Sequence, residues 1–200
     1  MPESPLADLR SRLLDSAIAI VEAQGTAGLT VRAVAKAAGC STMGVYTHFS
    51  GKSGLIDAVV EAGFDSLDAA LDRAFEDGGG GHDGLIATGL AYRTWALEHA
   101  PQFHTMFVPA VAGHQPSDTT RDRTWDSFFA HRARVAAALD SADSDPTAWH
   151  EAAARMWATL HGHVSLELLR RTHAMSDEPF SDYAAAVDVA LAVDARGVAN

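Results

Sequence analysis

Four side chains on one short stretch are candidates for the outward face of a helix and for contact with nucleic acid. They are Thr42, Met43, Tyr46 and Thr47. Val45 and Phe49, four residues apart, fall on the opposite face of a helix over residues 42–49 and can be buried. Hydroxyl groups donate and accept hydrogen bonds, and a methionine can contact the methyl group of thymine. Because a helix fits the major groove of B-DNA, this face is a candidate for nucleic-acid recognition.

The neighbouring elements predict how this face would be positioned. Thr30 can cap a helix over roughly residues 31–38, and Ser41 can cap the next helix. Between them, Gly39 supplies the backbone freedom that a tight turn needs, and the small side chain of Ala35 lets the two helices cross closely. Two short helices joined by such a turn have the layout of a helix-turn-helix.

Three ordered segments make this pattern more specific. They read Leu29-Thr30-Val31-Arg32, then Val34-Ala35-x-x-Ala38-Gly39, and then Val45-Tyr46-x-His48-Phe49-x-x-Lys52. With them, residues 8–64 resemble the DNA-binding domain of the TetR (tetracycline repressor) family of bacterial transcription regulators. Gly44 departs from the resemblance, because larger residues occur there in the family, and this departure predicts one base contact fewer.

The resemblance implies two kinds of DNA contact. Base edges would be read by Arg32, Thr42, Met43 and Thr47. Phosphates would be bound by Thr30, Ser41, Tyr46, His48 and Lys52. An arginine can pair with guanine through two hydrogen bonds, and Lys52 would add its charge to the positive end of a fourth helix. Few of these side chains read bases, so part of the sequence preference is expected to come from DNA shape.

Composition and charge restrict the class of protein. The chain has 200 residues, 48% of them apolar, and a net charge of −11, which argues against binding nucleic acid with the whole surface. Residues 1–53 hold five basic and four acidic groups, so only this end can approach a polyanion. No apolar run is long enough to span a membrane, residues 1–5 lack the features of a secretory signal, and Cys40 is the single cysteine. These features predict a cytoplasmic protein.

Helical periodicity dominates the chain, and it predicts an all-α fold. Helices are expected near residues 8–24, 31–38, 42–49, 52–75, 83–99, 102–107, 120–139, 146–172 and 180–194. Four consecutive glycines, residues 78–81, form a loop between helices. We expect a three-helix DNA-binding domain over residues 1–53, followed by a helical ligand-binding and dimerisation domain over residues 54–200.

Large apolar side chains gather in the middle of the second predicted domain. Together with a few polar residues they could line a pocket for a small apolar ligand, although such a cluster can equally be plain core. The candidate ligand-binding residues are Tyr92, Trp95, Phe103, Met106, Phe107, Trp125, Phe128, Phe129, Arg132, Trp157 and His161. Arg93 and His99 are further candidate polar anchors.

The pattern Trp157-x-x-x-His161-Gly162 resembles the C-terminal domain of a TetR subgroup known by its Trp-His-Gly signature. In the family, the last two long helices of each subunit form a four-helix dimer interface. The resemblance therefore implies an interface that includes Trp157, Leu160, Val164, Leu168, Val187 and Leu191. The alternative is that these helices only close the core of one subunit.

Motifs for catalysis and metal binding are missing from the sequence. It has no G-x-S-x-G, phosphate-loop or H-E-x-x-H pattern, and no two of its ten histidines are four residues apart. We therefore predict no enzyme activity, cofactor or metal site. The resemblance implies a homodimeric transcriptional regulator, a repressor that a small molecule releases from a palindromic double-stranded DNA operator. An activator or a ligand-independent regulator of the same fold is the alternative.

Overall fold

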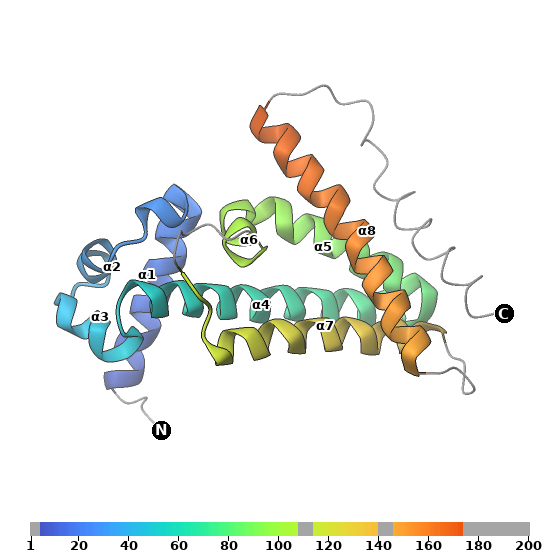
Figure 1. The fold of residues 1–200 in the computed structure, drawn as a ribbon, viewed down its shortest axis with the longest axis horizontal. Coiled ribbons are helices and arrows are strands. Elements are labelled where there is room, and N and C mark those ends of the chain that lie inside the picture. Colours follow the sequence, from blue (N-terminus) through green and yellow to red (C-terminus); the bar gives the residue numbers. More distant parts are fainter. Residues whose placement is uncertain (1–4, 108–113, 140–145, 174–200) are drawn as a thin grey trace. The chain divides into compact units, whose positions relative to one another are not determined.

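The computed structural model describes residues 5–107, 114–139 and 146–173, all of its regular elements being helices. In chain order they are α1 (Pro5–Gly28), α2 (Val31–Ala37), α3 (Thr42–Phe49), α4 (Lys52–Asp77), α5 (Gly81–Glu98), α6 (Ala100–Phe107), α7 (Asp118–Leu139) and α8 (Pro146–His173). Figure 1 shows them coloured along the chain. The all-α prediction is confirmed, while the helix expected near residues 180–194 lies outside the described residues.

The chain divides into two compact units. Unit 1 comprises Met1–Ser66 and His99–Trp125, and unit 2 comprises Leu67–Glu98 and Asp126–Asn200. Two long helices, α4 and α7, each begin in unit 1 and continue into unit 2. The boundary between the compact units therefore falls within α4 and α7. The division into a DNA-binding and a ligand-binding domain after residue 53 stays a prediction.

Unit 1 is built on the buried face of α1. Leu13, Ala17 and Val21 form a core with Val34 of α2 and Phe49 of α3, all nearly inaccessible to solvent. α6 packs against α1, and the side-chain amide of Gln102 on α6 donates a hydrogen bond of 3.0 Å to the carbonyl of Val59 on α4. The three N-terminal helices are thus held by α4 and α6 as well as by one another.

Unit 2 is built around the packing of α5 against α8. Apolar side chains of both helices, such as Trp95 and Leu160, are buried there. Arg93 donates two hydrogen bonds of 2.7 Å to the carboxylate of Glu167, which is itself buried. A charged pair of this kind fixes the register of the two helices, because removal of one partner would leave the other charge buried alone.

Candidate functional site

α3 presents its polar face and two large apolar side chains to solvent. Met43 is 70% exposed and Tyr46 is 55% exposed, and Thr42 and Thr47 are exposed as well. Val45 and Phe49 are buried on the opposite face, as the spacing predicts. The structure therefore brings together the four side chains that were expected to face DNA.

Local backbone geometry sets the angle between α2 and α3. Thr30 has an extended backbone and its hydroxyl oxygen accepts a hydrogen bond of 3.1 Å from the amide of Ala33, so it caps α2. Gly39 takes a positive φ of 68°, and the amide of Cys40 donates to the carbonyl of Ala35 at 2.9 Å to close the turn. Ser41 has the backbone of an N-cap, yet its side chain makes no capping hydrogen bond.

Close packing surrounds the glycine at position 44. A Cβ atom there would lie 3.3 Å from Sγ of Cys40 and 3.7 Å from Cδ2 of Leu9. A side chain at this position would thus press on the turn and on α1. Tight packing is therefore one reason for a glycine at position 44, and the expectation of one base contact fewer stays a prediction.

The start of α4 lies next to the end of α3 and carries the predicted phosphate ligand Lys52. Lys52 is half-buried, and its ammonium group is 3.5 Å from the carbonyl oxygen of Thr26 at the end of α1. His48 is also half-buried, whereas Arg32 on α2 is exposed. An ammonium group has three donors, so Lys52 can bind this carbonyl and a phosphate together.

A close approach of backbone fixes the connection between α3 and α4. Ser50 adopts a left-handed conformation with φ 55°, and Gly51 follows with φ 99°. Any Cβ atom on Gly54 would overlap the carbonyl oxygen of Phe49. The first turn of α4 can therefore lie this close to the end of α3 only because residue 54 is glycine.

Unit 1 also contains a pocket of about 490 Å³, a volume in the range of small-molecule sites. Its apolar lining includes Ile56, Val60, Met106, Phe107 and Trp125. Its polar lining includes Thr26, Thr105, His114, Gln115, Thr120, Arg121 and Thr124. Of the expected ligand-binding residues, Met106, Phe107 and Trp125 line this pocket. The buried Phe103 contacts Phe107, with tilted rings whose centroids are 4.8 Å apart.

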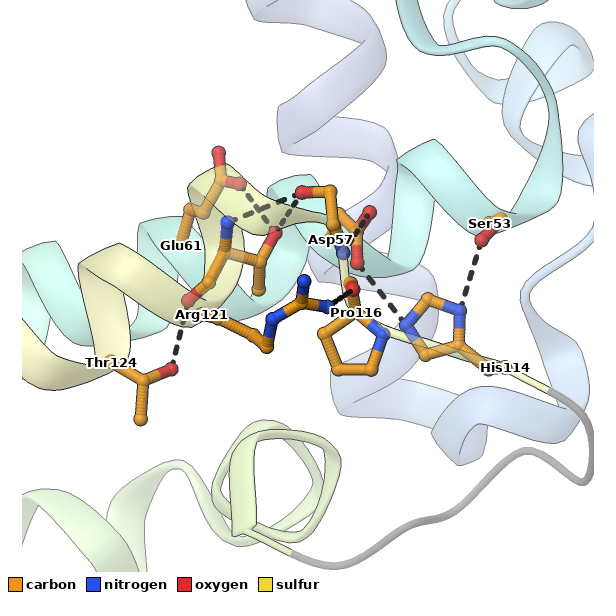
Figure 2. Close-up of polar contacts among 9 residues, drawn as sticks. Ser53, Asp57, Glu61, His114, Pro116, Arg121 and Thr124 are labelled. Carbon is orange, nitrogen blue, oxygen red and sulfur yellow. Dashed lines mark hydrogen bonds and ion pairs between the residues drawn. The ribbon is translucent and has the colours of Figure 1, made fainter.

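A polar network beside this pocket joins α4 to the segment that leads into α7 (Figure 2). Nδ1 of His114 is 3.0 Å from the hydroxyl oxygen of Ser53, and Nε2 is 3.1 Å from Oδ1 of Asp57. The hydroxyl of Thr120 donates a hydrogen bond of 2.6 Å to the carboxylate of Glu61. The sequence analysis missed these residues. One signal was present: Ser53, Asp57 and Glu61 recur every four residues and so share one face of α4.

The other expected ligand-binding residues belong to unit 2. Phe128 contacts Trp157, with ring centroids 6.1 Å apart, and Trp157 contacts His161 at 5.6 Å. Nδ1 of His161 is 2.7 Å from the hydroxyl of Tyr92. The set expected to line one pocket is therefore spread over both units. Its other members in unit 2 are the buried Trp95, the exposed Phe129 and Arg132, whose guanidinium lies 5.2 Å from the centre of the Phe129 ring.

Two histidines of unit 2 are held in the neutral form. Burial lowers the pKa of His161. Burial also lowers the pKa of His131 to about 4, helped by the positive charge of Arg134 and opposed by a 3.1 Å contact between Nε2 and the carbonyl of Ala153. Each ring therefore serves as a hydrogen-bonding group of the interior at neutral pH.

The expected dimer residues on α8 fall into two classes. Leu160, Val164 and Leu168 are buried within the single chain, and their place at an interface stays a prediction. Trp157 is 38% exposed, and Leu166 and Leu169, which the prediction omitted, are 45% and 49% exposed. The apolar stripe seen in the sequence is thus the face that packs inward. Val187 and Leu191 lie outside the described residues.

Residues 5–107, 114–139 and 146–173 lack the features of a metal site and of a membrane span. No group of three His, Cys, Asp or Glu side chains in them could hold a metal ion. Among the same residues, no helix combines the length and apolarity that a membrane span requires.

Comparison with known proteins identifies relatives of the whole chain. A protein of Rhodococcus sp. RHA1 with unknown function has a similar structure, with a TM-score of 0.73 and 28% identity over 96% of each chain. A TetR-family transcriptional regulator from Streptomyces coelicolor has the same fold, with a TM-score of 0.74 and 22% identity over 98% of this chain and 85% of that one. An uncharacterised HTH-type transcriptional regulator of Mycobacterium tuberculosis, Rv0681, is 26% identical over 159 residues, which are 80% of this chain and 70% of that protein.

Two family models match this chain, one in its N-terminal part and one in its C-terminal part. The model of bacterial regulatory proteins of the tetR family matches residues 13–59, which include α2 and α3. The model of the tetracyclin repressor-like C-terminal domain matches residues 85–191, more than half of the chain. The Trp-His-Gly subgroup stays a prediction. From these matches and the helix-turn-helix geometry, the chain belongs to the TetR family of transcriptional regulators.

Proposed function

We propose that a homodimer of this chain represses transcription by binding a palindromic operator, and that a small molecule releases it. The observation that carries the DNA contact is the exposed face of α3, where Met43 and Tyr46 stand in solvent beside two threonines. Met43 is 70% exposed on an eight-residue helix, so most of its apolar surface contributes no packing energy to the free protein. Such a face is accounted for by a partner surface, and the major groove fits a helix.

The proposed DNA contacts separate into two groups. Arg32, Thr42, Met43 and Thr47 would read base edges, and their loss would change which sequences are bound. Phosphates would be bound by Thr30, Ser41, Tyr46, His48 and Lys52. Loss of a phosphate contact would weaken binding to all sequences alike and reduce the salt dependence. These residues lie in the proposed DNA-binding domain, residues 1–53.

We propose that the effector binds the unit 1 pocket, whose lining combines apolar side chains with threonine hydroxyl groups. This lining suits an uncharged, mostly apolar molecule that carries a few hydrogen-bonding groups. The aromatic cluster of unit 2 around Phe128, Trp157 and His161 is the second candidate for the effector site. We propose a cytoplasmic location and no catalytic activity or cofactor. An activator, or a regulator without a ligand, would use the same DNA contacts.

Selection from a random DNA library, followed by fluorescence anisotropy on the enriched duplex, tests this proposal. Arg32→Ala is expected to relax sequence preference, and Lys52→Ala to weaken binding to every duplex by about fivefold or more. Arg73→Ala is the matched control, because Arg73 is an exposed cation of α4 in unit 2. Failure to enrich any sequence, or equal binding by all four proteins, would refute the proposal.

A further inference from the structure

We propose that His114 is a positioning residue for DNA binding: it holds the first two turns of α4, and with them Lys52, in the arrangement that contacts phosphate. This inference rests on the proposed function. It concerns unit 1 only, where His114, the start of α4 and the end of α1 all lie.

One imidazole ring bridges a full turn of α4. Nδ1 of His114 faces the hydroxyl of Ser53 at 3.0 Å, and Nε2 faces Asp57 at 3.1 Å (Figure 2). Ser53 directly follows Lys52, the first residue of α4, and Asp57 lies four residues after Ser53. The ring therefore fastens the segment before α7 to the end of α4 that would meet DNA.

Electrostatics gives this bridge its strength. Oδ1 of Asp57 is buried and accepts no hydrogen bond within the described residues, so the ring nitrogen of His114 at 3.1 Å is what compensates it. The other carboxylate oxygen accepts from the amide of Ser117 at 3.3 Å. A buried carboxylate oxygen is costly without a donor or a positive charge beside it. Removal of the imidazole would therefore favour a shift of α4 that lets water reach Asp57.

Further contacts keep both partners of the bridge in place. The hydroxyl of Thr120 bonds to Glu61 at 2.6 Å, one turn beyond Asp57, and Nε of Arg123 bonds to Asp65 at 2.7 Å. In addition, Lys52 reaches the carbonyl of Thr26 in α1 at 3.5 Å. The start of α4 is thus held between α1 and His114.

His114 also lines the pocket, together with Thr26, Ile56 and Thr120. A molecule in the pocket would contact the same ring that holds Ser53 and Asp57. His114 is therefore placed between the candidate effector site and the DNA-contacting end of α4.

A double-mutant cycle with Lys52 tests the inference. DNA affinity is measured by anisotropy for wild type, His114→Ala, Lys52→Ala and the double variant, with His104→Ala as the control, since His104 is an exposed histidine of α6. His114→Ala is expected to weaken binding about fivefold in the wild-type background, as for one lost hydrogen bond, and by less than about twofold in the Lys52→Ala background. His114→Gln, which keeps a side-chain donor, is expected to restore part of the affinity.

Amide hydrogen exchange gives a second readout that needs no DNA. Faster exchange over residues 52–58 in His114→Ala, with no such change in His104→Ala, is expected. Equal affinity of His114→Ala and wild type, the same fold loss in both backgrounds, or unchanged exchange would overturn the role of His114. Wild-type protein that binds no DNA would instead refute the proposed function itself, so the two failures are distinguishable.

Discussion

Tyr46 combines a packing role with an exposed hydroxyl. Its ring lies against Gly51, where an added Cβ atom would be 3.2 Å from Cε1, and the side chain is more than half exposed. The ring therefore supports the turn between α3 and α4, while the hydroxyl can reach a phosphate. The two roles can be separated by substitution.

Tyr46→Phe is expected to weaken DNA binding about fivefold for every sequence, because it removes one hydrogen bond and keeps the ring. The thermal midpoint of unfolding should stay at the wild-type value. Tyr46→Ala, which also removes the ring, is expected to lower that midpoint. Calorimetry and anisotropy on the three proteins check both statements, and undiminished affinity of Tyr46→Phe would exclude the phosphate contact.

His131 makes the stability of the protein depend on pH. Its pKa is about 4 in the folded protein against an ordinary 6.5, so the unfolded chain binds the extra proton first as the pH falls. Above pH 6.5 both states are neutral at this residue, and between about pH 6.5 and 4 acid favours unfolding, by up to about 3 kcal/mol. The lowered pKa of His161 acts in the same direction.

Urea unfolding of wild type and His131→Gln at pH 7.5 and pH 5.0 measures how much His131 contributes to the pH dependence of the unfolding free energy. Glutamine does not titrate, so the difference in unfolding free energy between the two proteins should shrink at the lower pH. A difference that stays constant between the two pH values would show that His131 does not control acid stability.

At the scale of elements, two glycines inside helices should respond in opposite ways to alanine. A Cβ atom on Gly54 would overlap the carbonyl oxygen of Phe49, whereas nothing lies within 4 Å of one on Gly162 of α8. Gly54→Ala is expected to destabilise the protein by about 1–3 kcal/mol through backbone displacement. Gly162→Ala is expected to stabilise it by about 0.5–1 kcal/mol through helix propensity. Urea unfolding at one protein concentration compares them, and a harmless Gly54→Ala would contradict the close approach.

The helix-turn-helix could be predicted from the sequence because its determinants are local. Thr30, Gly39 and the spacing of Val45 and Phe49 act within a few residues of one another, and the structure places α3 at the predicted bounds. The contact between His114 and Asp57 could not be predicted, because the two residues are 57 positions apart. Only the recurrence of polar residues along α4 pointed to a neighbouring helix.

The apolar stripe of α8 shows a second limit of sequence reasoning. Periodicity identifies which residues share a face, but it does not say whether the same subunit or another one covers that face. Leu160, Val164 and Leu168 are buried within the single chain, so their burial alone accounts for the stripe, and its role in a dimer stays a prediction. Whether the same subunit or a partner subunit buries this face depends on tertiary packing, which cannot be read from the sequence pattern.

At the scale of the whole molecule, DNA recognition by a single helix-turn-helix is weak, and a symmetric pair reads two half-sites about 34–36 Å apart. A self-complementary apolar surface is what a twofold pair requires. On α8, Trp157, Leu166 and Leu169 are the large apolar side chains that remain exposed. Leu166 and Leu169 are about 60° apart around α8, whereas Trp157 lies on the opposite side of the helix from Leu166. We therefore propose that Leu166 and Leu169, in place of Leu160, Val164 and Leu168, form the part of the dimer interface contributed by α8.

Leu166→Glu combined with Leu169→Glu is expected to convert the dimer to a monomer, because four like charges would meet across the twofold axis without solvent. Size-exclusion chromatography with light scattering measures the mass, and affinity for the selected palindrome should fall more than about tenfold while the helix content stays constant. Phe129→Glu on α7 is the control, since Phe129 is an exposed apolar residue of the same unit and should leave the mass unchanged. If the double variant stays dimeric, a different surface joins the subunits; if it is monomeric yet binds the palindrome as tightly as wild type, the two half-sites are not read by one pair.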